Sequence, residues 1–237
     1  MKDYVHPETG KTYNVDKLEL KTDEGRGFGK AKFILKEGGT LGDLYTHADL
    51  KRDINGNILI DDSGNVTAID NAGDIKLGSV LPKANLAWNN SFSYKGINAG
   101  FLLTARLGGI VYSATQAYLD LYGVSETSAA ARDAGGVWIN GRSHVNPQSF
   151  YEVVASQSGL PTYYTYSATN LRLQEAHIGY TVPRRWLGNV CDINVSLVGR
   201  NLWMIYCKAP FDPEAVATTN NYYQGIDYFM MPSTRNI

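Results

Sequence analysis

Two runs of alternating residues, joined by a two-residue turn, constrain the fold of this chain more than any other feature. In residues 84–94 every second side chain is apolar, with Asn90 as the one exception, and the alternation continues through residues 97–107. The intervening residues are mostly small or polar and almost never charged. Because successive side chains of a strand point to opposite faces, the pattern predicts a hairpin of two long strands that turns at Lys95-Gly96.

A second pair of long strands is predicted in residues 170–182 and 193–205, joined by a turn at Pro183–Asn189. The apolar residues of the first strand change phase partway along it: Leu171 and Leu173, then Ala176, Ile178 and Tyr180. A strand with a period of two cannot change phase without an extra residue, so we expect a β-bulge near Gln174-Glu175.

These strands exceed the usual length of about five or six residues. Only 19% of the residues are charged, against roughly 25% in soluble domains. Aromatic residues lie towards strand ends, at Tyr94, Tyr180 and Trp203. Together these features predict an all-β fold that is part of a transmembrane antiparallel β-barrel, with short periplasmic turns and long extracellular loops. A soluble β-sandwich stays open as the alternative.

Four segments carry a resemblance to a known family: LRLQEAHIGYTVP (171–183), VSLVGRNLWMI (195–205), FDPE (211–214) and GIDY (225–228). In this order they resemble the C-terminal barrel of the SusC/RagA family of TonB-linked (TonB-dependent) outer-membrane transporters. Residues 78–112 and 38–64 are similar to the preceding parts of that barrel. The family-motif positions, to which the resemblance gives a structural role, are Arg172, Gly179, Tyr180, Gly199, Asn201, Asp212, Pro213 and Asp227.

The resemblance implies a barrel of about 22 strands whose long extracellular loops carry short helices. Residues 1–77 would form a strand and extracellular-loop region, and residues 78–237 the C-terminal strands and loops. We find no signal peptide, TonB box or plug in the sequence, and the closing strand is missing. The chain is therefore expected to be a piece of a longer transporter.

By the same resemblance, the parent protein lies in the bacterial outer membrane, surrounded by outer-membrane lipid. It would import oligosaccharides or peptides with a SusD-type surface lipoprotein as partner, and would contact TonB through its missing N-terminal part. Such a protein is not an enzyme and needs no cofactor. The alternative from another class is a soluble β-rich carbohydrate-binding module without transport activity.

Aromatic residues concentrate in the long connection between the two hairpins and in the C-terminal loop. Tyrosine and tryptophan present rigid amphipathic faces that suit sugar rings or peptide side chains. The predicted substrate-binding residues are Trp138, Tyr163, Tyr164, Tyr166 and Tyr223. The alternative is that these rings pack the loops. Short helices are expected at residues 113–123 and 127–136, each ending in glycine.

Other chemistry finds little support in the sequence. A net charge of -1 gives no basic surface for nucleic acid. Residues 25–32 do not match a phosphate-binding loop, and the four histidines lack the spacing of a metal site. The Asp- and Asn-rich residues 53–65 are assigned to turns rather than to a calcium loop, because Ile58 and Val66 stand where that loop requires glycine. No carboxylate pair indicates a glycan hydrolase. Cys191 and Cys207 flank one strand, so we expect free thiols.

Overall fold

The computed structural model describes residues 4–5, 7–13, 16–20, 30–141, 143–156, 159–188, 190–216 and 224–237. These residues belong to two compact units, which are treated separately below. The loop unit comprises Met1–Leu81, Ile110–Tyr166 and Val216–Met230, and the sheet unit comprises Pro82–Gly109, Ser167–Ala215 and Met231–Ile237. The division into residues 1–77 and 78–237 concerns the parent barrel and stays a prediction.

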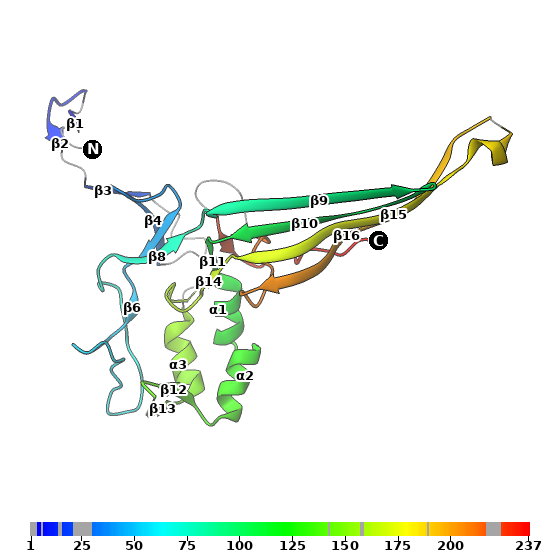
Figure 1. Cartoon of the computed structure of the whole chain (residues 1–237). Helices are drawn as coiled ribbons and strands as arrows, with labels where there is room; N and C mark the ends of the chain where they lie inside the picture. The colour runs from blue at the N-terminus through cyan, green and yellow to red at the C-terminus, as the bar shows by residue number, and fades with distance from the viewer. Residues whose placement is uncertain are drawn as a thin grey trace. The chain divides into compact units, whose positions relative to one another are not determined.

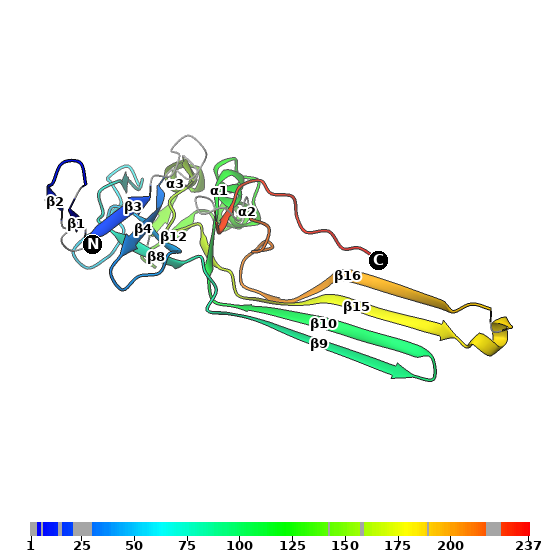
Figure 2. The same ribbon diagram turned by 90° about the horizontal axis from the view of Figure 1, so that it is seen from above.

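Four long antiparallel strands form the sheet unit, in the spatial order β16-β15-β10-β9 (Figures 1 and 2). They are β9 (Ala84–Tyr94), β10 (Ile97–Leu107), β15 (Asn170–Val182) and β16 (Ile193–Cys207). Lys95 and Gly96 connect β9 to β10 with φ angles of 47° and 86°. Positive φ at both positions is the geometry of a tight hairpin turn. Both predicted strand pairs are thus present.

The predicted bulge is found at Gln174. Leu102 lies opposite Glu175 and Leu103 lies opposite Leu173, which leaves Gln174 without a cross-strand partner in β10. One extra residue shifts the phase of β15, so the apolar residues before and after the bulge lie on the same face.

Cross-strand register shows the apolar face as rows of side chains that run across all four strands. One row is Tyr94, Ile97, Tyr180 and Val195; the next is Phe92, Ala99, Ile178 and Leu197. Beyond the bulge the row is Trp88, Leu103, Leu173 and Trp203. Most of these large side chains are exposed in the sheet unit. An apolar surface continuous over four strands is far larger than soluble proteins usually leave uncovered.

The opposite face of the sheet is polar. Its residues include Ser93, Asn98, Glu175, His177 and Arg200. Glu175 and His177 share this face, as their spacing predicts, and the Glu175 carboxylate accepts a hydrogen bond of 3.1 Å from Arg200 Nε. The sheet therefore combines an apolar face with a wet one, as a barrel wall requires.

The loop unit is built from short strands and three helices. Its main sheet has the order β3-β4-β5-β8, formed by Lys17–Leu20, Ala31–Lys36, Asp43–Thr46 and Ile75–Ser79. Smaller pairings join β1 (Tyr4–Val5) to β2 (Thr12–Tyr13), β6 (Asp49–Leu50) to β7 (Ala68–Ile69), and β12 (Val137–Ile139) to β13 (Ser143–Val145). A further sheet has the order β14-β11-β17, formed by Thr165–Ser167, Ile110–Ser113 and Ile226–Asp227.

The helices are α1 (Ala114–Leu121), α2 (Glu126–Asp133) and α3 (Pro147–Val154). The first two match the predicted short helices, and each begins at a serine that caps the backbone: Ser113 and Ser125. The third was not predicted, although Asn146 caps it and proline occupies its first turn. Among the described residues, none of the helices has the length and apolar character to cross a membrane.

The apolar core of the loop unit connects its sheets to its helices. Leu44, Tyr112, Phe150 and Ile226 are among its buried members, and they come from three separate stretches of sequence. Tyr112 is fully buried, and its hydroxyl donates to the carbonyl of Gly159 at 3.3 Å. The prediction of an all-β architecture with loops that carry short helices is confirmed.

Candidate functional site

The loop unit contains a cavity of about 320 Å³ lined mainly by aromatic side chains, which we call the aromatic pocket. Its walls come from the connection before β7, from all three helices, from β12 and from the segment leading into β14. Four of the predicted substrate-binding residues line it: Trp138, Tyr163, Tyr164 and Tyr166. The fifth, Tyr223, lies outside the described residues.

The four rings differ in their access to solvent. Trp138 is 61% exposed and contacts His144 on the adjacent strand, with ring centroids 3.8 Å apart. Tyr164 is 2% exposed. Tyr163 is half-buried and meets Phe150 edge to face at 6.1 Å. Trp138 is therefore the ring that a ligand can reach most easily, whereas Tyr164 mainly packs and orders the pocket floor.

The floor of the pocket is organised by Asp120, a buried carboxylate on α1 that the sequence analysis did not select. Its oxygens accept hydrogen bonds from the Tyr164 hydroxyl at 3.0 Å, Thr127 Oγ1 at 2.9 Å and Gln116 Nε2 at 3.1 Å. The Ser125 hydroxyl donates a further short hydrogen bond to it. A buried carboxylate is costly unless its acceptors are satisfied, and here four donors supply them.

A signal for Asp120 was present in the sequence. Ala114, Ala117 and Asp120 are the buried residues of α1, and their spacing of three places them along one face of the helix. A charged residue on an otherwise small, apolar helix face indicates a buried polar contact. Its partner Tyr164 lies 44 residues away, so the contact itself could not be predicted.

Burial keeps the pocket tyrosines in their neutral form. Loss of solvent, reinforced by the negative charge of Asp120 and by Tyr151, raises the pKa of Tyr166 to about 12. Burial likewise raises the pKa of Tyr163, where nearby Arg52 opposes the change. Burial and the Asp120 carboxylate raise the pKa of Tyr164 as well. The pocket thus offers aromatic ring faces and neutral phenol hydroxyl groups. These groups suit the binding of an uncharged ligand surface rather than the breaking of a bond.

In the sheet unit, residues of three separate motifs meet in one polar cluster. Arg172 on β15 forms an ion pair with Asp212 of the FDPE segment at 2.6 Å, and their side chains are only 4% and 11% exposed. Arg172 also lies 3.5 Å from Asn201 Oδ1 and 3.3 Å from Glu214. Ser233 Oγ donates to Asp212 at 2.5 Å. We call these residues the Arg172–Asp212 cluster; it ties the loop after β16 back to the sheet.

Burial raises the pKa of Asp212, but this effect is outweighed by hydrogen bonds from Arg172, Ser233 and the backbone N–H of Glu214. The pKa of this carboxyl therefore lies below its ordinary value, and Asp212 is charged at neutral pH. It serves the cluster as the acceptor of several donors. The structural role that the family resemblance implies for these positions stays a prediction.

The remaining family-motif positions have local structural settings. Asp227 accepts a hydrogen bond of 2.6 Å from Ser113 Oγ between paired strands of the loop unit. A Cβ at Gly179 would lie 3.0 Å from the Cβ of Ser196, and one at Gly199 would lie 2.6 Å from Leu202. Tyr180 lies on the apolar face, and Pro213 follows Asp212 in the Arg172–Asp212 cluster. The role of these positions stays a prediction.

The Asp- and Asn-rich segment forms two successive loops of the same design. Asp53 Oδ1 accepts from the N–H groups of Asn55 and Asn57, each at 2.8 Å. Eight residues later, Asp61 Oδ1 accepts from the N–H groups of Ser63 and Asn65 at 3.0 and 2.7 Å. These side chain–backbone bonds account for the residue pattern as turn formation.

A group of possible metal-ligand type occurs at Glu19, His47 and Asp74, whose ligand atoms lie within 4.8 Å of one another. Lys17 Nζ lies 2.9 Å from Asp74 and 3.5 Å from Glu19, so a lysine already compensates the two carboxylates. Its hydrogen bond lowers the pKa of Asp74. The sequence did not predict this group, and the absence of a metal site stays a prediction. Cys191 and Cys207 are free thiols, as expected.

Comparison with known proteins supplies sequence and fold relatives, although no family model matches the chain. TonB-dependent receptor P3 of Formosa agariphila is 23% identical over 245 residues, covering 93% of this chain and 24% of the receptor. The RagAB peptide importer in its closed-closed state superposes with a TM-score of 0.52 at 15% identity, covering 92% of this chain and 27% of the other. The RagAB peptide transporter gives 0.52 at 14% identity, with coverage of 93% and 23%. The chain spans about a quarter of the proteins it matches.

Long strands with one exposed apolar face and one wet face define a segment of an outer-membrane barrel wall with its loops. The sequence relative is a TonB-dependent receptor and the fold is that of the RagAB importers, so the chain is similar to a segment of a TonB-dependent transporter of the SusC/RagA type. The predicted resemblance and the location in the bacterial outer membrane are confirmed. Because the relatives are receptors and transporters, the prediction that the chain is not an enzyme is confirmed as well.

Proposed function

We propose that the parent of this chain imports oligosaccharides or peptides across the outer membrane, driven by TonB and assisted by a SusD-type surface lipoprotein. In this proposal the sheet unit is barrel wall, with its apolar face towards lipid. The loop unit is extracellular and presents the aromatic pocket to the ligand. The RagAB relatives are named as peptide importers, which supports the peptide arm of the proposal.

The observation that carries the proposal is the continuous apolar face of the sheet. Trp88, Phe92, Val195 and Leu197 are each more than half exposed within the sheet unit. Such a surface is favourable in hydrocarbon and unfavourable in water, by roughly 25 cal/mol per Å² of apolar area. The polar face opposite contains Asn, Ser, His and an ion pair, which suits a hydrated lumen.

Ligand contact is assigned to the aromatic pocket on the strength of Trp138. Its exposed indole stands at the rim, while Tyr163 and Tyr166 supply neutral hydroxyl groups within the same cavity. A ring at the rim with polar groups inside is the usual composition of a small-ligand pocket. Tyr223 belongs to the proposed contact set from its sequence alone.

The test is uptake by cells that express the parent receptor with Trp138→Ala. Transport of fluorescent oligosaccharides and of fluorescent peptides is measured separately, with the amount of receptor in the outer membrane as the reference. We expect uptake of one ligand class to fall severalfold with Trp138→Ala and to be retained with Trp138→Phe. Tyr122→Ala is the matched control, because this ring is 74% exposed and does not line the pocket. Unchanged uptake of both classes would refute the ligand role.

The competing function is a soluble β-rich carbohydrate-binding module. It requires the purified chain to be monomeric in the absence of detergent. Detergent-dependent solubility, together with migration on gels that changes on heating, is the result expected for barrel wall. A detergent-free monomer that binds oligosaccharide would decide for the module.

A further inference from the structure

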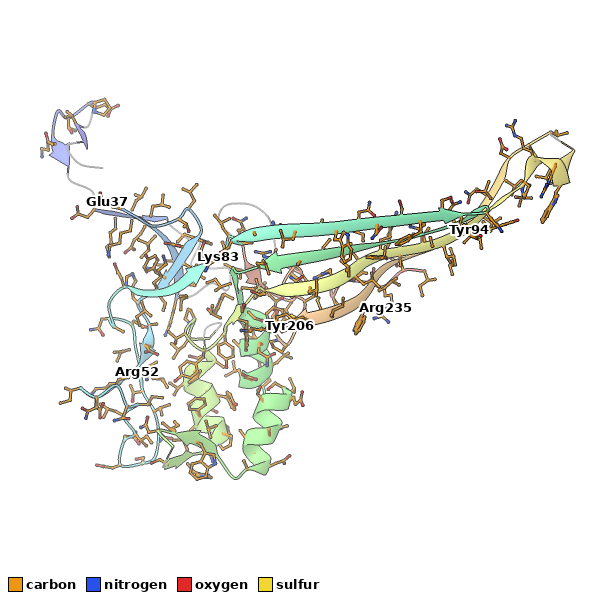
Figure 3. All side chains as sticks on the ribbon, in the orientation of Figure 1. Glu37, Arg52, Lys83, Tyr94, Tyr206 and Arg235 are labelled. Atoms are coloured by element: carbon orange, nitrogen blue, oxygen red, sulfur yellow. The ribbon has the colours of Figure 1, made fainter. Side chains whose placement is uncertain are left out.

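One end of the sheet unit combines exposed aromatic rings with positive charge. The two short turns of the sheet lie at this end, at Lys95-Gly96 and at residues 183–188 with 190–192. We call it the short-turn end; it comprises Tyr94, Lys95, Tyr180, Arg184, Arg185 and Trp186. In Figure 3, Tyr94 lies at the opposite end of β9 from Lys83.

The two turns are held next to each other by hydrogen bonds. The backbone N–H of Thr181 donates to the carbonyl of Gly96 at 2.7 Å, and its hydroxyl accepts from the side chain of Asn98 at 3.1 Å. The turn of Arg184–Leu187 (η2) reaches beyond the tips of β9 and β10 (Figures 1 and 2). Residues from both turns therefore share one surface just past the last row of the apolar face.

This surface carries uncompensated positive charge. Arg184 is engaged by Asp192, with Nε 2.6 Å from the carboxylate. Neither Lys95 nor Arg185 has a carboxylate partner among the described residues; Lys95 lies over the Tyr94 ring at 5.2 Å. The positive charges of Lys95, Arg184 and Arg185 are thus only partly balanced by the single negative charge of Asp192.

Large apolar side chains stand beside these cations without cover. Trp186 is 65% exposed and Val190 is 86% exposed. An exposed indole next to a free lysine or arginine is typical of the membrane interface, where hydrocarbon meets lipid headgroups. Each of these side chains can place its apolar part in the hydrocarbon and its polar part among the headgroups.

We propose that the short-turn end binds the phosphodiester headgroups of anionic phospholipids in the adjoining membrane leaflet. Lys95 and Arg185 contribute the charge, and Trp186 anchors the turn at the hydrocarbon boundary. The inference rests on the proposed function in one respect, that the apolar face of the sheet lies in a bilayer. Juxtamembrane lysine and arginine each strengthen attraction to an anionic lipid surface by about fivefold.

The chain provides its own reporter position, because Cys191 is exposed within the same turn. A fluorophore is attached there in the parent receptor, which carries Cys207→Ser and has every other cysteine replaced, and this receptor is reconstituted into phosphatidylcholine vesicles. Spin-labelled phosphatidylglycerol and spin-labelled phosphatidylcholine are then compared as quenchers. We expect phosphatidylglycerol to quench more strongly. Lys95→Asn and Arg185→Gln should each lower this preference by about fivefold, while Lys83→Asn at the far end of β9 should leave it unchanged. Asparagine suits position 95, since it tolerates a φ of 47°.

The outcomes separate the two proposals. Equal quenching by both lipids, or a preference unaffected by Lys95→Asn and Arg185→Gln, would overturn the headgroup site alone. Full displacement of phosphatidylglycerol by inorganic phosphate would identify a site for small anions and would also overturn it. Absence of quenching by either lipid would show that the sheet is not in the bilayer, and the proposed function would then fail first.

Discussion

Replacing Asp212 by alanine removes one partner of a buried ion pair. Arg172 is 4% exposed at its side chain, and Asp212 accepts from it at 2.6 Å and from Ser233 at 2.5 Å. In Asp212→Ala the guanidinium stays buried with Glu214 as its remaining carboxylate, which is 42% exposed and 3.3 Å away. Breaking a buried pair from one side typically costs about 3–5 kcal/mol, because an uncompensated charge is left behind. We expect a loss of this size in the free energy of unfolding.

The assay is denaturant unfolding of the refolded chain in detergent, followed by tryptophan fluorescence and by heat-dependent gel migration. Asp192→Ala is the matched control. Asp192 forms the same kind of arginine–carboxylate pair with Arg184, but both side chains of this pair are more than half exposed, so removing Asp192 should leave stability unchanged. The double variant Arg172→Met with Asp212→Leu should recover most of the loss, since apolar residues of similar volume often replace a buried pair without cost.

The reasoning fails if Asp212→Ala unfolds at the same denaturant concentration as Asp192→Ala. That result would mean that the Arg172–Asp212 pair is as weak as a solvated surface pair. A double variant no more stable than Asp212→Ala would instead mean that the cluster contributes through Ser233 and the loop rather than through compensated charge.

Three further predictions concern the bulge in β15, the pKa of Asp212 and the aromatic pocket. Deleting Gln174 should abolish heat-dependent gel migration, because it moves part of the apolar face to the polar side; Gln174→Ala should keep it. Because the pKa of Asp212 is lowered in the folded protein, the charged carboxylate stabilises the fold fully at neutral pH, and this stabilisation is lost as the pH falls through that pKa. Asp212→Asn should therefore have a lower free energy of unfolding at neutral pH. In unfolding titrations its free energy of unfolding should fall less on acidification than that of the unsubstituted protein. Tyr164→Phe should cost about 1–3 kcal/mol in denaturant unfolding, because buried Asp120 loses a donor, and an unchanged midpoint would contradict its hydrogen bond.

Features that depend on neighbouring residues could be predicted from the sequence. The alternation in residues 84–107 determines which side chains share a face, and Lys95-Gly96 determines the turn, so the hairpin follows from local rules. The serine-capped α1 and α2 follow from capping in the same way. Helix α3 carries a comparable signal, since Asn146 precedes a proline in the first turn, so this helix too is predictable from its local sequence.

Features that join distant segments could not be predicted from local pattern. The aromatic pocket needs Asp120 on α1 and Tyr164 before β14 to meet, and nothing in either segment specifies the other. Its rings could be selected as ligand-binding candidates by type alone. Their common cavity and their unequal exposure depend on the packing of three helices and a hairpin around it.

The bulge at Gln174 links the membrane face to the Arg172–Asp212 cluster. With the bulge, Leu171 and Leu173 align with Ala105 and Leu103 on the apolar face, and Arg172 lies between them on the polar face. Without it, the register of β15 would move by one residue, and Arg172 would join the apolar row. An arginine on the lipid face is unfavourable, by about 2–4 kcal/mol at the bilayer midplane and by less towards the interfaces, and Arg172 is the third residue of β15. The phase change in the sequence therefore allows one strand to meet lipid along its whole length and still direct an arginine to the FDPE loop.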